Sequence, residues 1–146
     1  MKFIVTLFLF SLIIYVPSFS QVDSLSLKRI YEKEVIYFSG NKYIKNNTLY
    51  PIKNLKTEFK KNSEGYLVYE MAQKDDKKFT ILYTIGFAGY IAGFAMLEDK
   101  PNTGAGVMIA GSVPLVISFH FAGRSDKRKK KAVWLRNRDI LIERSY

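Results

Sequence analysis

Two long segments without charged side chains dominate the hydropathy pattern of this chain. Residues 79–97 contain no charged residue, and residues 104–123 contain only His120 as a titratable group. About 20 apolar residues are enough for a helix to cross the hydrocarbon core of a bilayer, and both segments meet that criterion. The pattern predicts two transmembrane helices. The alternative is a pair of buried core helices in a small soluble α-helical domain.

The connection between these two segments is short. Residues 98–103 read EDKPNT, and a connection of this length forces neighbouring helices to run antiparallel. The predicted fold class is therefore a mainly α membrane protein with a two-helix transmembrane hairpin. A small N-terminal region with a β-hairpin and helices precedes it, and a basic C-terminal helix follows.

Residues 21–78 predict a small extramembrane module that begins with strands. Alternating apolar and polar positions indicate a β-hairpin at about 35–50. Asn46 and Asn47 supply its turn, because asparagine tolerates the positive φ angles that a two-residue hairpin loop requires.

Two helices are predicted after the strands, at about 54–61 and 63–78, with Asn54 and Ser63 as their N-caps. Neither glycine nor proline lies between Tyr66 and Phe79 to end the second helix. We therefore expect one long helix that passes from water into lipid. A break near Asp75 and Asp76 is the alternative.

The first 20 residues have the layout of a secretory signal peptide. Lys2 precedes an uncharged run at 3–16, Pro17 follows as a breaker, and the expected cleavage is after Ser20. The apolar run is short for a membrane span, and an uncleaved N-terminal anchor is the alternative. In both cases we expect the following residues to be delivered across the inner membrane.

Glycines in the two apolar segments need a compensating role, because glycine in a helix costs about 1 kcal/mol relative to alanine. Small residues in membrane helices allow the close backbone approach that holds such helices together. We expect the two small-residue faces to pack against each other or against a second copy, and the alternative is that glycine is simply common in membrane helices. The predicted helix-packing residues are Gly86, Gly89, Gly93, Gly104, Gly106, Ala110, Gly111 and Ser118.

The formal net charge of +10 is concentrated after the second apolar segment. Residues 124–146 are predicted to form a basic, partly helical tail. A basic segment beside a membrane binds anionic lipid with about 1 kcal/mol per Lys or Arg, and the alternative is a merely solvated flank. The candidate lipid-binding residues are Arg124, Lys127, Arg128, Lys129, Lys130 and Lys131.

The sequence contains no pattern that indicates catalysis or cofactor binding. The chain has no cysteine, which excludes thiolate nucleophiles and Cys-based metal sites. The acids show no metal-ligand or Ser–His–acid spacing. We predict neither an enzyme nor a cofactor or metal. Nucleic acid is not an expected partner, because an exported chain would not meet it.

The predicted topology contains a conflict. If residues 21–78 are exported, the hairpin returns the basic residues 127–131 to the same side, against the positive-inside rule. One resolution is that the hairpin ends in the outer membrane or in an envelope assembly. The other is that the N-terminal segment does not export the module and both ends of the hairpin are cytoplasmic.

Three stretches carry a resemblance: SGNKYIKNNTLYPIKNLKTEFKKNSEGYLVYEMAQK, the glycine-rich IGFAGYIAGFAM, and AGRSDKRKKKAVWLRN. Their order resembles a group of small Bacteroidota-type envelope proteins that have a signal peptide, a short hairpin-plus-helix region and a glycine-rich membrane hairpin. A looser resemblance is to glycine-zipper envelope proteins, without their lipoprotein cysteine. Both imply the architecture and no activity.

These observations predict a non-enzymatic envelope membrane protein whose glycine-packed hairpin mediates association with a second copy or another membrane protein. The alternative function is binding of anionic lipid or another polyanion through Lys127–Lys131. Membrane lipid is an expected partner in both cases. A pore-forming hairpin is a third class, but the segments lack a polar helical face to line a channel.

Overall fold

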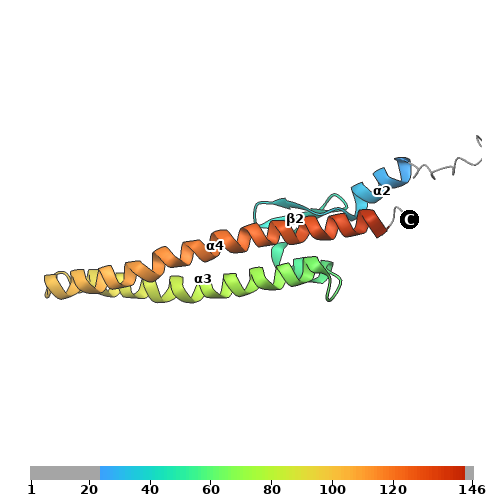
Figure 1. Ribbon diagram of the computed structural model, residues 1–146. Helices are drawn as coiled ribbons and strands as arrows, with labels where there is room; N and C mark the ends of the chain where they lie inside the picture. Colours follow the sequence, from blue (N-terminus) through green and yellow to red (C-terminus); the bar gives the residue numbers. More distant parts are fainter. Residues whose placement is uncertain (1–23, 144–146) are drawn as a thin grey trace, which may run out of the picture.

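The computed structural model of the protein describes residues 24–143, so the predicted signal peptide lies outside the described residues. The fold is mainly helical with one small sheet and two long apolar helices (Figure 1). Its elements in chain order are α2 (Ser24–Glu34), β1 (Tyr37–Ser39), β2 (Lys42–Lys45), β3 (Thr48–Pro51), the 3-10 helix η1 (Ile52–Glu58), α3 (Glu64–Ala95) and α4 (Pro101–Glu143).

The three strands form an antiparallel sheet in the order β1-β2-β3. Asn46 and Asn47, with φ angles of 49° and 57°, make the turn between β2 and β3, which confirms the predicted turn chemistry. In this register Tyr43 lies opposite Tyr50, and their rings stack at 5.3 Å between centroids. Tyr43 is buried in the core, so this face of β2 is the core face and the neighbouring positions point away from it.

Helix α3 is one continuous helix from the polar region into the apolar segment. Ser63 caps its N-terminus, and the Ser63 Oγ accepts a hydrogen bond of 3.1 Å from the backbone N–H of Tyr66. The expectation of a single long helix is confirmed, and a break at Asp75 and Asp76 is wrong. At 1.5 Å per residue, its 32 residues span about 48 Å.

Helix α4 differs from the sequence prediction at both ends. It begins at Pro101 rather than at 104, and it continues without interruption to Glu143. The predicted helical character of 124–146 is confirmed for residues 124–143, but these residues are the second half of α4 and not a segment of their own. Its 43 residues span about 64 Å.

Two smaller elements also differ from the prediction. The helix expected at 54–61 is the 3-10 helix Ile52–Glu58, which starts directly after Pro51 and is therefore not capped by Asn54. Helix α2 (Ser24–Glu34) was not predicted at all.

The hydrophobic core lies at one end of the molecule, under the sheet. Its members come from the sheet region, η1, the first half of α3 and the last part of α4: Ile36, Tyr43, Leu55, Phe59, Val68, Tyr69, Ala132, Val133 and Leu135. The module is thus not residues 21–78 alone, because α4 supplies three of its buried side chains. Figure 1 shows the two helices continuing from this core as a long pair that ends in the turn.

Candidate functional site

A stripe of small residues on α4 faces α3 along most of the helix pair. Gly104, Gly111, Ser118, Ser125 and Ala132 follow one another at intervals of seven residues, and all five are buried. A seven-residue repeat of contact positions is typical of two helices in a left-handed supercoil. The apolar segment and the polar half of α4 therefore share one contact stripe, which we call the small-residue seam.

Three glycines in the apolar half of α3 form the opposing side of the seam there. A Cβ atom on Gly86 would lie 2.8 Å from the carbonyl oxygen of Gly111, and one on Gly93 would lie 2.8 Å from that of Gly104. Gly89 has more room, since its Cβ would lie 3.2 Å from the Cα of Gly111. Real Cβ atoms do not approach backbone atoms within 3 Å. The close spacing of the two helices therefore requires glycine at positions 86 and 93.

Two predicted packing residues lie outside the seam. A Cβ atom on Gly106 would meet nothing within 4 Å, and Ala110 is exposed. They are four residues apart and face away from α3. The other six predicted packing residues meet between α3 and α4 of the same chain.

Two serines continue the seam from the apolar segment of α4 into its polar half. The Ser118 Oγ donates to the carbonyl oxygen of Leu115 on its own helix at 2.6 Å. The Ser125 Oγ donates across the pair to the carbonyl oxygen of Ala72 at 3.1 Å. Ser125 is not among the predicted packing residues, although its place seven residues after Ser118 is a usable signal.

Most of the predicted lipid-binding cations are ion-paired within the chain. Asp75, whose side chain is 3% exposed, contacts Arg128 at 2.6 Å and Arg124 at 3.5 Å. Asp76 contacts Lys129 at 2.6 Å. These pairs join α3 to α4 directly beside the apolar segments.

The remaining three predicted cations differ among themselves. Lys130 pairs with Asp126 of its own helix at 2.7 Å, and both side chains are exposed. Lys127 and Lys131 are exposed and belong to no ion pair found among residues 24–143. Only these two of the six candidates are free to bind an external anion.

Three lysines of α3 lie at the level of the basic residues of α4 along the helix pair. They are not among the predicted site residues. Lys74, Lys77 and Lys78 are exposed. The Lys78 Nζ lies 5.3 Å from the centroid of the Phe121 ring on α4, and the Arg124 guanidinium lies 5.7 Å from the same ring. The basic region is therefore built from both helices rather than from one run of sequence.

A buried polar network fastens the sheet region to α4. The Arg136 guanidinium donates to the carbonyl oxygens of Glu58 and Glu34 at 2.9 and 2.7 Å, and it pairs with the Glu58 carboxylate at 3.1 Å. Burial lowers the pKa of Arg136 from its ordinary value, and the nearby Glu58 carboxylate offsets part of that effect. The network fixes η1 and the end of α2 against one helix.

Asn137 completes this connection, because its side-chain amide bonds both backbone polar groups of Ile36 as a neighbouring strand would. Its Oδ1 accepts from the backbone N–H of Ile36 at 3.0 Å, and its Nδ2 donates to the Ile36 carbonyl oxygen at 2.9 Å. Both backbone groups of Ile36 are thereby satisfied where no strand lies beside it. Neither Arg136 nor Asn137 stood out in the sequence, because their partners are 78 to 102 residues away.

Within residues 24–143, no three His, Cys, Asp or Glu side chains come together in a way that could hold a metal ion. Comparison of the chain with protein-family models, with curated proteins and with solved structures found no match. The resemblance to small Bacteroidota-type envelope proteins therefore stays a prediction.

Proposed function

We propose that the protein is a non-enzymatic membrane protein of the bacterial cell envelope, in which the apolar halves of α3 and α4 span the bilayer as a helical hairpin. The hairpin would hold the sheet module at the membrane surface. One observation carries this proposal: only 11% of the most apolar 18-residue stretch of each helix is buried within the protein.

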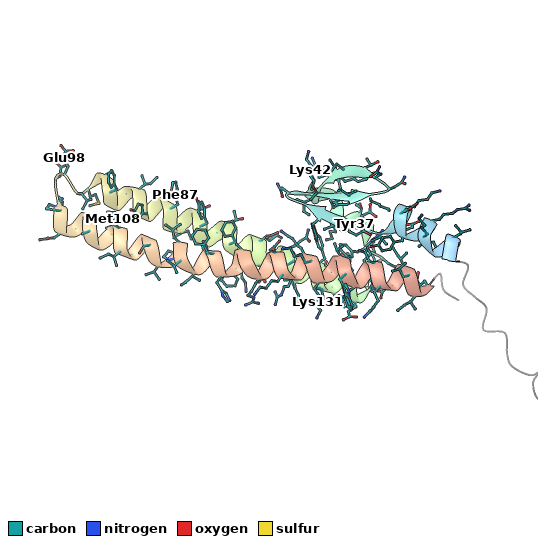
Figure 2. The ribbon with its side chains drawn as sticks, turned by 90° about the horizontal axis from the view of Figure 1, so that it is seen from above. Tyr37, Lys42, Phe87, Glu98, Met108 and Lys131 are labelled. Atoms are coloured by element: carbon teal, nitrogen blue, oxygen red, sulfur yellow. The ribbon has the colours of Figure 1, made fainter. Side chains whose placement is uncertain are left out.

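That low burial argues against two core helices of a soluble domain. The seam occupies one narrow face of each helix, and large apolar side chains are exposed around the rest, among them Ile85, Phe94, Ile109 and Val116. Phe87, another of them, marks this surface in Figure 2. Monomeric soluble proteins rarely expose continuous apolar surface of more than a few hundred Å². Lipid is the environment that would cover such a surface on all sides.

Association with a second copy forms the second part of the proposal. The space beside the seam glycines is already occupied by the backbone of the other helix of the same chain, so these glycines stabilise the hairpin itself. They are Gly86, Gly93, Gly104 and Gly111. Gly106 and Ala110 remain open on the outer face of α4 and would allow close approach of another helix.

The buried polar side chains favour a structural role over catalysis. Asp75, Ser118, Ser125 and Arg136 are the buried polar residues of the described chain, and each is bonded to a structural partner. None is left pointing into a cavity with a free donor or acceptor.

Membrane insertion is tested by labelling with a membrane-impermeant thiol reagent, because the chain has no native cysteine. Cysteines replacing Asp99 and Lys127 should lie on opposite sides of the membrane, and cysteines replacing Ser39 and Lys127 on the same side. In Figure 2, Glu98 marks the turn of the hairpin and Lys131 marks the end that carries the sheet module. Equal labelling of Asp99→Cys and Lys127→Cys in intact cells, before permeabilisation, would contradict the hairpin.

The same labelling resolves the topology conflict. Labelling of Lys127→Cys only after the inner membrane is opened would support a cytoplasmic module, and labelling from the periplasm would support an exported one. Self-association is tested separately: Ala110→Cys should form a disulfide-linked dimer in membranes, and Gly106→Leu should abolish it. Equal crosslinking from Ile91→Cys, which lies on the outer face of α3, would remove the self-association claim.

A further inference from the structure

We propose that five lysines at the end of the apolar segments form a collar that binds the phosphate headgroups of anionic phospholipids. The lysine collar consists of Lys74, Lys77, Lys78, Lys127 and Lys131. The inference rests on the proposed insertion of the hairpin in a bilayer. It replaces the predicted lipid-binding set, of which it retains only Lys127 and Lys131.

The collar lies at the depth of the headgroups when the apolar segments fill the hydrocarbon core. The headgroup layer is about 5 to 8 Å thick on each side of a bilayer. Lys77 and Lys78 directly precede the apolar segment of α3, and Lys74 lies about 7 Å before it. Lys127 lies about 6 Å beyond the apolar segment of α4, and Lys131 about 12 Å.

Lysine side chains can cover the remaining distances. Their long apolar stems lie along the helix while the ammonium group reaches the polar layer. Lys78 already adopts such a position, since its Nζ lies over the Phe121 ring at the end of the apolar segment. Lys131 projects on the side of the hairpin away from the sheet (Figure 2), so the module does not cover it.

The collar is uncompensated because the neighbouring acids are already occupied. Asp75 and Asp76 bind Arg124, Arg128 and Lys129, and Asp126 binds Lys130. No acid of residues 24–143 pairs with a collar lysine within 4.0 Å. The inner cations thus tie the two helices together, while the outer lysines are left to bind external phosphate.

The test measures the preference for phosphatidylglycerol over phosphatidylcholine around the full-length protein. Nanodiscs with a four-to-one mixture of phosphatidylcholine and phosphatidylglycerol would contain a trace of either lipid in spin-labelled form, and the motionally restricted fraction would be quantified. The wild-type chain should retain labelled phosphatidylglycerol preferentially. Replacement of all five collar lysines by Gln should reduce this preference at least tenfold.

A matched control removes the same charge elsewhere. Lys28, Lys33, Lys42, Lys53 and Lys61 are exposed lysines of the module, and their replacement by Gln should leave the preference unchanged. Equal loss in both variants would overturn the collar, because it would show an effect of net charge alone. Absence of preference in the wild-type chain would overturn it as well.

Two further measurements separate headgroup binding from membrane insertion and from binding of a free ion. Flotation of the wild-type chain with pure phosphatidylcholine vesicles tests insertion without any anionic lipid, so a chain that floats but shows no preference refutes only the collar. Inorganic phosphate, compared with chloride at equal ionic strength, should displace no more labelled lipid than chloride does. Selective displacement by phosphate would instead indicate a site for the free ion and would overturn the lipid proposal.

Discussion

Gly93 of α3 and Gly104 of α4 lie back to back, and a Cβ atom on either one would fall 2.8 Å from the carbonyl oxygen of the other. The relationship is reciprocal, so the two backbones are in direct contact with no side chain between them. Both residues lie near the turn, where the hairpin reverses direction. Contact of this kind stabilises through dispersion between many closely packed atoms, which also operates where no hydrophobic effect drives helices together.

The same Gly→Ala substitution should have opposite effects at two positions of α4. Gly111→Ala places a methyl group within 3 Å of the Gly89 and Gly86 backbones, and overpacking of this kind costs about 1 to 3 kcal/mol. Gly106→Ala meets open space and should be neutral or stabilise by up to about 1 kcal/mol through helix propensity. Unfolding in a titration of denaturing detergent, followed by circular dichroism, measures both. Destabilisation of equal size would contradict the seam.

Replacement of a buried aspartate should cost more stability than replacement of an exposed one. Asp75→Asn leaves Arg128 without its anion in a site where the aspartate is 3% exposed, and we expect a loss of about 2 to 4 kcal/mol in the free energy of unfolding. Asp126→Asn removes an exposed pair with Lys130 and should cost less than about 0.5 kcal/mol. The measurement is the unfolding free energy in detergent solution, and comparable losses would show that Asp75 does not act as a clamp between the helices.

Two adjacent residues of α4 test whether this helix belongs to the core of the module. Leu135 is 1% exposed and Trp134 is 59% exposed. Leu135→Ala should cost about 2 to 5 kcal/mol and broaden the amide resonances of the sheet. Trp134→Ala should cost less, although it removes the larger side chain and its contact with Arg138 at 5.5 Å. Ranking in the opposite order would favour an independent C-terminal tail.

Alkaline pH should destabilise the module through a buried tyrosine. Burial, followed by the nearby Glu58 carboxylate, raises the pKa of Tyr43 from 10.0 to about 12. A raised pKa in the folded state means that the stability contributed by neutral Tyr43 is complete below pH 10 and is lost as the pH rises toward about 12. The free energy of unfolding, measured by urea denaturation at several pH values, should fall over this range.

The contribution of Tyr43 can be separated from that of other tyrosines. The pKa of Tyr37 is also raised to about 12, chiefly by burial, so part of the alkaline loss should persist in Tyr43→Phe. The variant should nevertheless show a smaller fall between pH 10 and 12 than the wild-type chain. It should also be less stable at neutral pH, because it lacks the 3.3 Å hydrogen bond from the Tyr43 hydroxyl to Glu58. Identical pH profiles would refute the assignment.

Local patterns in the sequence were sufficient to predict the long helices, the sheet turn and the helix start. The uncharged segment 104–123 lies in α4, and 79–97 lies in α3 except for its last two residues, because α3 ends at Ala95. Asn46 and Asn47 form the turn between β2 and β3, and Ser63 is the N-cap of α3. Each of these depends on residues within one or two turns of the chain. Backbone conformational preference, capping and hydrophobic run length are short-range effects that are readable without a fold.

Tertiary structure alone decided how the polar half of α4 is used. A basic run in the sequence has the same pattern whether it is solvated or packed, and only the antiparallel register places Asp75 beside Arg128 and Ala72 beside Ser125. The same register leaves Gly106 outside the seam while Gly104 and Gly111 lie within it. Ion pairing and close packing depend on distance in space, and residues 53 positions apart meet here only because the turn at 96–100 folds one helix back along the other.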